Sequence, residues 1–378
     1  VELEIEKQLG IHTKAEIEEY GVESFNQLCR ESVFRYVKDW EAMTERVGFW
    51  VDLDNAYVTY ENDYIETSWW IIKTLWDAGL VYQGRRVAPH CPRCGTTLSS
   101  HEVALGYKDN TPDPSIYVKF EAVVDGLHPS LAAVLSPDGT TTTTYLLAWT
   151  TTPWTLPGNS GLSVSADDVY VVVEMASGER FILAEALLRT VLQDDYVVRA
   201  RCTGGDLAGL RYKPLYNPWE FGIEVHEFSE RGSNVLNPAQ RPAGTLTYPV
   251  IDAHFVSTED GTGIVHTAPP FGEDDYAVGS ANGLYFIQPV NLAGAFEGTY
   301  VFAGKFVKNA DAAVIEDLKA RGLLYRRETV KHTYPFCWRC DTPLLYYAKS
   351  SWYLRTSSVK DRMVAANEEI NWTPEHIK

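Results

Sequence analysis

Hydrophobic residues in the first fifty positions recur at three- and four-residue spacing. The longest such pattern covers residues 25–43, and its members are Phe25, Cys29, Val33, Tyr36, Val37, Trp40 and Met43. One buried face of an α-helix requires this spacing, so the pattern predicts a helix. Ser24 followed by Gln27 forms a capping-box pattern, which predicts the start of that helix.

A second helical pattern runs from about Asp63 to Ala78. Its apolar residues share one face, and they are Ile65, Trp69, Ile72 and Trp76. Gly79 follows directly and supplies a stop, because glycine adopts the left-handed conformation that ends many helices. We predict that these tryptophans belong to a hydrophobic core and do not form a platform for a ligand. Helical periodicity returns from Asn309 to Leu324.

From about residue 115 the pattern changes to that of strands. Four runs are rich in β-branched and aromatic residues: 115–120, 144–149, 169–174 and 181–184. Turn-forming residues Ser-Pro-Asp-Gly occupy positions 136–139, between the first two runs. The spacing is short and irregular and glycine is frequent, so the centre of the chain is predicted to be a barrel-like β domain.

Composition limits the class of protein. The chain has 378 residues, 45% of them hydrophobic, which is enough for two or three domains with ordinary cores. No apolar run approaches a membrane span and no signal peptide opens the sequence, so we expect a cytoplasmic protein with no membrane partner. We also expect a monomer. The first residue is Val1 rather than Met, and we therefore expect an excised piece of a larger protein.

The balance of charge argues against a broad nucleic-acid-coating surface, because the formal net charge is -18. Residues 319–361 are the exception. They hold nine Lys or Arg residues against three acidic ones: Glu328, Asp341 and Asp361. A solvated face is the more common explanation of such a stretch, and contact with a phosphate backbone is the alternative.

Four of the six cysteines form two Cys-x-x-Cys pairs. Cys91-Pro-Arg-Cys94 and Cys337-Trp-Arg-Cys340 each have the form of a rubredoxin-type knuckle, with a turn-forming residue after the last cysteine. Two knuckles complete a tetrahedral four-cysteine shell for Zn²⁺, with bonds of about 2.3 Å. Such a closed shell is structural, and a redox pair would need a thioredoxin-like βαβ context that is missing here. The alternative is two independent pairs that are completed by His90, His101 or His332.

The distance between the two knuckles is informative about domain organisation. Because 242 residues lie between Cys94 and Cys337, a shared ion brings the two ends of that long segment together. The β-rich section is then an inserted domain that leaves and rejoins one scaffold through neighbouring strands. Cys29 and Cys202 remain outside the pairs, and we interpret them as small buried residues.

The peptide 149–159 reads Trp-Thr-Thr-Thr-Pro-Trp-Thr-Leu-Pro-Gly-Asn. Three consecutive hydroxyl groups are flanked by Trp149 and Trp154, and two prolines stiffen the segment, so it cannot be the interior of a helix. A rigid edge of this kind suits a polar ligand that accepts hydrogen bonds from the hydroxyl groups and packs against an aromatic surface. The alternative is a threonine-rich strand that runs into a proline turn.

A second constellation occupies residues 261–276. A short strand at Ile264 and Val265 precedes His266, and a proline-rich turn follows. Three carboxylates then open a predicted helix: Glu273, Asp274 and Asp275. First-turn carboxylates complement the helix dipole, which is the structural explanation. In the functional interpretation one carboxylate binds an ammonium group while His266 lines a pocket. No Gly-x-Ser-x-Gly elbow and no Cys/His pair marks a covalent nucleophile, so a hydrolase would depend on the positioning of water and substrate.

These motifs together resemble the isoleucine/valine/leucine group of class I aminoacyl-tRNA synthetases, over essentially the whole chain. Residues 1–10 look like the segment just after the first ATP-site motif, and residues 88–95 look like the zinc knuckle of this group. The valine and leucine enzymes carry Thr-Thr-Arg-Pro at the editing peptide. Residues 149–154 read Trp-Thr-Thr-Thr-Pro-Trp instead, which is the isoleucine form.

The resemblance implies an α+β, multidomain fold. A β-barrel-like editing domain would be inserted into a helical, zinc-ribbon-bearing part of a class I Rossmann catalytic domain. Residues 1–113 would be the helical segment of the catalytic or connective core with the first knuckle, and residues 114–327 the editing domain. Residues 328–378 would hold the second knuckle and the return to the catalytic core. Cys91, Cys94, Cys337 and Cys340 would bind structural zinc.

The resemblance also implies the activity. Isoleucine and valine differ by one methylene, the standard example of a difference that one binding site discriminates poorly, so a second site must remove errors. The editing domain would hydrolyse valine from the 3′ end of tRNA(Ile), while the parent enzyme attaches isoleucine with ATP and Mg²⁺. The catalytic group would comprise Thr150, Thr151 and Thr152, which hold the substrate, His266, which senses its side chain, and Asp275, which binds the α-ammonium. Further contacts would come from Trp149, Trp154, Asp274 and Glu273.

The chain departs from the family pattern in what it lacks. We find no His-Ile-Gly-His and no Lys-Met-Ser-Lys-Ser, the two ATP-site motifs, and no anticodon-binding helical domain. We therefore predict that this chain cannot aminoacylate tRNA but deacylates mischarged Val-tRNA(Ile). Two alternatives remain: a zinc-organised tRNA-binding or structural module without activity, and an editing domain of the valine or leucine type.

Overall fold

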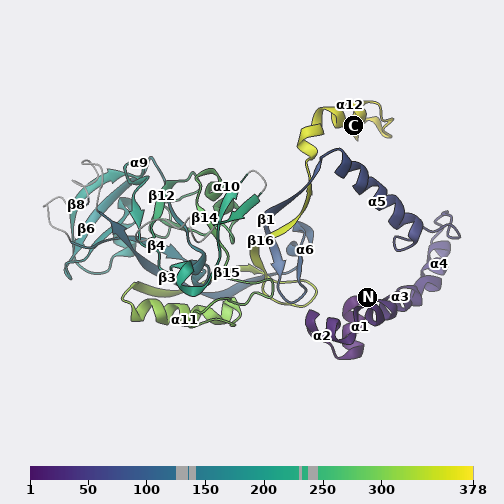
Figure 1. The fold of residues 1–378 in the computed structure, drawn as a ribbon, viewed down its shortest axis with the longest axis horizontal. Helices are drawn as coiled ribbons and strands as arrows, with labels where there is room; N and C mark the ends of the chain where they lie inside the picture. Colours follow the sequence, from purple (N-terminus) through teal and green to yellow (C-terminus); the bar gives the residue numbers. More distant parts are fainter. Residues whose placement is uncertain (125–134, 136–141, 230–231, 237–245, 378) are drawn as a thin grey trace. The chain divides into compact units, whose positions relative to one another are not determined.

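The computed structural model describes residues 1–377 except 125–134, 136–141, 230–231 and 237–245 (Figure 1). The turn predicted at residues 136–139 lies outside the described residues. Contacts divide the chain into two compact units, unit 1 with residues Val1–Gly84 and Ser351–Lys378, and unit 2 with residues Arg85–Ser350. The division into functional domains at residues 113/114 and 327/328 stays a prediction.

Unit 1 is mainly helical in its described residues, apart from loops and the ends of two strands. Its helices are α1 (Glu2–Leu9), α2 (Lys14–Tyr20), α3 (Val22–Val33), η1 (Phe34–Tyr36), α4 (Val37–Arg46), α5 (Asn62–Asp77), η6 (Thr356–Val359), α12 (Lys360–Glu368) and η7 (Glu375–Ile377). A small apolar cluster joins the first three helices, and its buried members are Ile5, Ile11, Ile17 and Phe25. No helix among the described residues is both long and apolar enough to cross a bilayer.

The first helical pattern is only partly confirmed. α3 begins at Val22 with Gly21 as its N-cap, so Ser24 lies inside the helix and the predicted capping box is wrong. The 3₁₀ turn η1 also interrupts the predicted helix at residues 34–36. Because a 3₁₀ turn has three residues per turn rather than 3.6, it rotates the apolar face. Of the predicted face only Phe25 is buried.

The second helix is confirmed, but the predicted burial of its tryptophans is wrong. α5 covers residues 62–77, and Gly79 follows with a φ of 69°. Trp69 is 68% exposed and Trp76 is 55% exposed. The ring of Trp76 lies 5.7 Å from that of Trp352. Helical periodicity predicts that a face is apolar but not that the same chain covers it.

Unit 2 is built on a mixed ten-stranded sheet. In spatial order its strands are β15 (Leu324–Pro335), β3 (Tyr107–Val123), β9 (Arg211–Tyr212), β12 (Tyr248–Asp252), β5 (Gly161–Val164), β13 (Val265–Thr267), β4 (Thr144–Thr150), β7 (Arg180–Ala184), β6 (Val169–Met175) and β8 (Tyr196–Thr203). All four strand patterns predicted from the sequence fall within β3, β4, β6 and β7.

The sheet differs from the predicted barrel in its pairing. Three neighbouring pairs are parallel, β12 with β5, β13 with β4, and β4 with β7, whereas the other described pairs are antiparallel. β3 also pairs with β4, which bends the sheet back on itself. Parallel neighbours need crossover connections and cannot arise from successive hairpins. The β-rich section is therefore a mixed, folded-back sheet and not a regular closed barrel.

Smaller elements complete unit 2. Two three-stranded sheets contain β1 (Val81–Cys91), β2 (Thr96–Thr97) and β16 (Leu345–Leu354), and β10 (Val225–Ser229), β11 (Gly232–Val235) and β14 (Tyr285–Ile287). The helices are α6 (Ser100–Ala104), η2 (Pro153–Gly158), η3 (Glu185–Leu187), α8 (Leu188–Val191), α9 (Gly204–Leu207), η4 (Pro218–Phe221), α10 (Glu273–Ala281) and α11 (Val307–Ala320). β1 and β16 each continue from unit 2 into unit 1.

The largest hydrophobic core of the described residues lies in unit 2, beside two smaller clusters. β3, β4, β6 and β7 contribute fully buried side chains to it, among them Ile116, Leu146, Val172 and Ile182. The helix predicted from Asn309 is confirmed as α11, which lies along β3 and β15 and packs against η2 (Figure 1). Its buried residues Val314, Ile315 and Leu318 join the same core. This core holds η2, the turn that carries the threonine-rich peptide.

Candidate functional site

The four paired cysteines come together. Their sulfur atoms all lie within 4.8 Å of one another, with Cys91 Sγ 3.5 Å and Cys94 Sγ 3.6 Å from Cys340 Sγ. The two knuckles have matching turns, since the N–H of Gly95 donates to the Cys91 carbonyl (2.9 Å) and that of Asp341 to the Cys337 carbonyl (2.8 Å). Gly95 and Asp341 both have positive φ, 65° and 61°. The prediction of one shared cluster is confirmed.

The donor set of this cluster fits zinc. Four sulfur ligands in a compact, largely buried group are typical of a tetrahedral structural site. Two of the other donors considered are engaged elsewhere, because His90 Nε2 is 2.8 Å from the Leu292 carbonyl and His332 Nε2 is 2.9 Å from Asp113 Oδ2. Among the described residues only the four cysteines form a group that could hold an ion here, and His101 is not part of it. The structure thus favours a four-cysteine shell over two independent pairs.

Protonation of the free thiols is set by burial and local hydrogen bonds. Burial raises the pKa of Cys91 strongly and that of Cys94 to about 11. Burial also acts to raise the pKa of Cys340, but hydrogen bonding with Thr342 and with the Cys91 and Cys94 thiols outweighs it and brings that pKa to about 7. A bound divalent cation deprotonates coordinating thiols, so zinc binding to this cluster would release protons.

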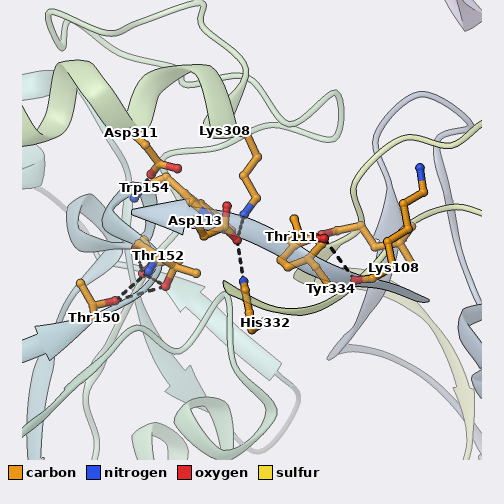
Figure 2. Close-up of polar contacts among 12 residues, drawn as sticks. Lys108, Thr111, Asp113, Thr150, Thr152, Trp154, Lys308, Asp311, His332 and Tyr334 are labelled. Atoms are coloured by element: carbon orange, nitrogen blue, oxygen red, sulfur yellow. Dashed lines mark hydrogen bonds and ion pairs between the residues drawn. The ribbon is translucent and has the colours of Figure 1, made fainter. Parts of the chain in front are cut away.

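A chain of hydroxyl groups follows the end of β4. Thr150 Oγ1 lies 3.3 Å from Thr152 Oγ1, which lies 3.2 Å from Thr155 Oγ1. Thr155 Oγ1 in turn lies 2.8 Å from His266 Nε2. We call these four residues the hydroxyl ladder, and Figure 2 shows its first members beside Trp154. The half-buried Thr151 lies between Thr150 and Thr152 in the chain but outside the ladder.

Strand pairing brings the two halves of the ladder together. β13 runs parallel to β4 with Val265 opposite Trp149, so the next residue, His266, lies beside the end of β4. The approach to β13 needs glycine, because Gly261 and Gly263 have φ of 69° and 71°. A Cβ on Gly263 would lie only 2.4 Å from that of Ala184. A residue larger than glycine at position 263 would therefore push this segment away from Ala184 and displace His266.

His266 is a neutral imidazole in this environment. The side chain is buried, and burial lowers the pKa of His266 to about 4. Its Nδ1 is buried and has no hydrogen-bond partner among the described residues. Buried polar atoms without partners are rare in folded proteins and often mark functional groups.

Asp275 differs from the two acidic residues before it. All three open α10, but only Asp275 Oδ2 accepts a hydrogen bond from the turn after His266, from the N–H of Ala268 at 2.8 Å. Burial raises the pKa of Asp275 to about 6, although that hydrogen bond opposes the rise. Glu273 and Asp274 are exposed, and Glu273 forms a loose ion pair with Arg86 at 3.6 Å. Among the described residues no hydrogen bond joins Asp275 to the ladder.

The two tryptophans support the site from its sides. Trp149 Nε1 donates to Ser115 Oγ at 2.5 Å, which ties the end of β4 to β3. Trp154 is buried and meets Phe271 edge to face with ring centroids 4.9 Å apart. Trp154 therefore supports the threonine-rich turn from within the hydrophobic core. Its backbone N–H donates to Asp311 Oδ1 at 3.0 Å.

Sequence reasoning missed Thr155 and Asp311. Thr155 lies in the threonine-rich peptide, three residues beyond Thr152, and a hydroxyl next to two others in a rigid turn was a usable signal. Asp311 is a charged residue on the buried face of α11, beside Ala310, Val314 and Ile315. An acidic residue at such a position needs a partner, which is the signal that would have found it.

Comparison with known proteins agrees with the motifs. A family model described as tRNA synthetases class I (I, L, M and V) matches residues 1–378. The chain belongs to this family. An isoleucine–tRNA ligase of Dehalococcoides mccartyi (strain 195) is 53% identical over 378 residues, which are 100% of this chain and 37% of that protein. Isoleucine–tRNA ligases of Clostridium novyi and Thermus thermophilus are 45% identical over 100% of this chain and 33% of each relative.

This class I synthetase chain thus spans about a third of the length of the curated relatives that it matches. Among solved structures, one titled as GlLeuRS-CP1 matches with a TM-score of 0.43 and 18% identity, over 57% of this chain and 99% of that chain. The editing domain of a Plasmodium knowlesi cytosolic leucyl-tRNA synthetase matches with a TM-score of 0.36 and 10% identity, over 59% and 97%. The family resemblance predicted from the motifs is confirmed by the family model and the curated relatives.

Proposed function

We propose that this chain hydrolyses mischarged aminoacyl-tRNA and removes valine from the 3′ end of tRNA(Ile). The observation that carries the proposal is the hydroxyl ladder, which begins in the peptide of the isoleucine form and ends on a buried neutral histidine. The names of the curated relatives support the choice of tRNA. The whole protein, by the same argument, attaches isoleucine to tRNA(Ile) with ATP and Mg²⁺.

The hydrolysis would proceed without a covalent enzyme intermediate. Water attacks the carbonyl carbon of the ester, the bond to the ribose oxygen breaks, and a proton passes to that oxygen, which leaves free valine and uncharged tRNA. The hydroxyl groups of Thr150 and Thr152 can donate to the ester and accept from the attacking water. Their rigid spacing supplies the orientation on which such a reaction depends.

His266 and Asp275 would recognise the amino acid. A neutral, buried imidazole lines an apolar side-chain pocket at a smaller desolvation cost than a charged one, and burial keeps His266 neutral at pH 7. Asp275 has a raised pKa of about 6 and is therefore ionised at neutral pH. An ionised carboxylate forms a charge-assisted hydrogen bond to the α-ammonium of the substrate.

The cysteine cluster would serve the fold rather than the chemistry. Zn²⁺ held by Cys91, Cys94, Cys337 and Cys340 would have all four positions filled by sulfur, with none open for water or substrate. These four residues join the segments where the chain enters β3 and where it leaves β15. The ion would thus fix the base of the two-stranded ribbon that leads to the ladder.

Several basic residues of the segment 319–361 are paired within the chain. Arg321 pairs with Asp317 at 2.8 Å, and Arg339 pairs with Glu102 at 2.7 Å. Such intramolecular pairs favour the solvated-face interpretation of this segment over a continuous phosphate-binding surface. We therefore centre the proposal on hydrolysis rather than on tRNA binding alone.

The test is deacylation of Val-tRNA(Ile) by the purified chain, beside Ile-tRNA(Ile), threonyl-tRNA and leucyl-tRNA. Valine should be released fastest from tRNA(Ile), and faster release from a leucyl- or threonyl-tRNA would indicate another specificity. Asp275→Ala should lower the rate by about a hundredfold or more while tRNA binding persists. Glu316→Ala, which removes an exposed carboxylate of α11, should change the rate less than twofold. Isoleucine-dependent ATP–pyrophosphate exchange by this chain would contradict the division of labour proposed here.

A further inference from the structure

Asp311 is a buried carboxylate that lies close to the threonine-rich turn. It belongs to α11, is 5% exposed, and is surrounded on its helix by apolar residues of the main core. Burying a charged group costs free energy unless a partner compensates. The partner is the backbone N–H of Trp154, 3.0 Å from Asp311 Oδ1 and 157 positions away in the sequence. Figure 2 shows Asp311 beside Trp154.

This hydrogen bond fills a position that a helix cap normally fills. η2 begins at Pro153, which has no N–H, so Trp154 carries the first donor of the turn. At most helix starts the side chain of the N-cap residue accepts a hydrogen bond from one of the first N–H groups. Thr152 is the N-cap of η2, but its side chain caps no N–H of the turn. Its hydroxyl is instead shared between Thr150 and Thr155.

We propose that Asp311 is a positioning residue of the site: its carboxylate caps η2 in place of the Thr152 hydroxyl, which keeps that hydroxyl in the ladder. The proposal rests on the proposed hydrolysis for its kinetic consequence. Without Asp311 the buried Trp154 N–H lacks a partner, and the nearest hydroxyl that can turn toward it belongs to Thr152. The ladder then loses its central member, although none of its residues has been changed.

The surroundings of Asp311 indicate that the hydrogen bond matters more than the charge. Lys308, one helical turn earlier, pairs with Asp113 at 2.7 Å, and Asp113 also contacts His332 (Figure 2). Burial raises the pKa of Asp311 to about 7, against the attraction of Lys308, so both protonation states occur near neutral pH. Either state keeps an oxygen that accepts from Trp154, and so does the amide of asparagine.

Three variants of the full chain test the proposal on Val-tRNA(Ile). Asp311→Ala should lower kcat for deacylation about tenfold with KM within twofold, because the turn is misplaced but the binding groups remain. Asp311→Asn keeps the acceptor and should stay within threefold of the wild type. Asp317→Ala is the matched control, since Asp317 is a carboxylate of the same helix that accepts from Tyr216 at 2.8 Å and not from η2. Its kcat should not change.

A double-mutant cycle separates positioning from a general loss of stability. If Asp311 acts through the Thr152 hydroxyl, Asp311→Ala should add little to the defect of Thr152→Val, so the two effects are not additive. Additive losses would overturn the proposal, as would an Asp311→Ala enzyme with kcat within twofold of the wild type. Equal losses in Asp311→Ala and Asp311→Asn would also overturn it, because the charge would then be the essential feature.

A measurement without substrate distinguishes this proposal from the proposed function. The Trp154 amide should exchange its hydrogen at least tenfold faster in Asp311→Ala than in Asp311→Asn or the wild type. If the wild type releases no valine but this pattern is observed, the proposed function fails and the capping role stands. If exchange at Trp154 is the same in all three proteins, the capping role is wrong whatever the activity.

Discussion

Units 1 and 2 differ in what happens to equally regular apolar patterns. In unit 2 the apolar positions of strands and of α11 meet in one continuous core. In unit 1 the buried cluster has four residues, while Trp40, Trp50, Trp69, Trp70 and Trp76 are all exposed. The difference teaches that periodicity determines which face of an element is apolar, and that the burial of this face depends on what lies opposite. The candidate site belongs wholly to the unit that covers its own apolar faces.

If the cysteine cluster of unit 2 binds zinc, removal of the ion should have the largest effect. Binding at a thousandfold excess over Kd stabilises a folded state by about 4 kcal/mol, so chelation should lower the melting temperature markedly. Cys91→Ser should abolish the stoichiometric zinc content measured by atomic emission. Cys29→Ser, in unit 1, should leave it at one ion per chain. Full zinc content in the Cys91 variant would show that the four sulfurs are not the ligands.

A core truncation in unit 2 should have the next largest effect. Leu146 in β4 is 0% exposed, and Leu146→Ala should lower the free energy of unfolding by about 2–5 kcal/mol in urea titrations. Leu105→Ala is the matched control, because that leucine is also in unit 2 but 74% exposed. Its cost should stay within about 0.5 kcal/mol. Similar losses for the two variants would contradict the distinction between covered and uncovered apolar residues.

The deacylation rate should depend on pH through the ionisation of Asp275 in unit 2. If the ionised carboxylate binds the substrate, the deacylation rate should rise with pH around the pKa of about 6 and be about tenfold lower at pH 5 than at its plateau. His266 stays neutral above its lowered pKa of about 4 and does not limit the rate in this range. A rate that is constant from pH 5 to 7 would remove Asp275 from the proposed role.

The same raised pKa has a consequence for stability. Asp275 holds its proton more tightly in the folded than in the unfolded chain, so its contribution to stability is complete below about pH 4 and is lost as pH rises through 6. Asp275→Asn should remove this part of the pH dependence. The difference in unfolding free energy between variant and wild type, measured at pH 4 and 7.5, checks the sign.

The smallest effect should come from unit 1. Trp70 is 66% exposed, so Trp70→Ala should change the free energy of unfolding by no more than about 0.5 kcal/mol. Deacylation should be unchanged, because the ladder lies in unit 2. Reduced binding of a hydrophobic dye would confirm that the ring is accessible. A loss comparable to that of Leu146→Ala would show that unit 1 covers its tryptophans after all.

Local patterns predicted much of the fold. Alternation and composition identified β3, β4, β6 and β7, and helical spacing identified α5 and α11. The parallel pairings of β4 with β13 and β7 could not be predicted from the sequence, because they join segments far apart in the chain and no local signal specifies them. The barrel-like expectation failed for the same reason.

The candidate site shows the same limit. The knuckle spacing identified all four cysteines, and the threonine-rich peptide and His266 were recognised by their unusual neighbours. Local sequence pattern did not distinguish Asp275 from Glu273 and Asp274, and only the family resemblance singled it out. In the structure the hydrogen bond from Ala268 and the burial of Asp275 separate it from the other two. Asp311 was missed because its partner, Trp154, is brought to it by tertiary packing.

The ribbon of β3 and β15 has a consequence for how such a chain can change over time. The two strands pair from Tyr107 opposite Pro335 to Val118 opposite Leu324, so the intervening segment begins and ends at adjacent points. The entropy of closing a loop grows only with the logarithm of its length. A segment attached in this way can gain, lose or exchange whole elements at little cost to the scaffold. We therefore expect the β-rich section to tolerate transfer to another antiparallel strand pair, and grafting of residues 114–327 onto such a pair would test this expectation.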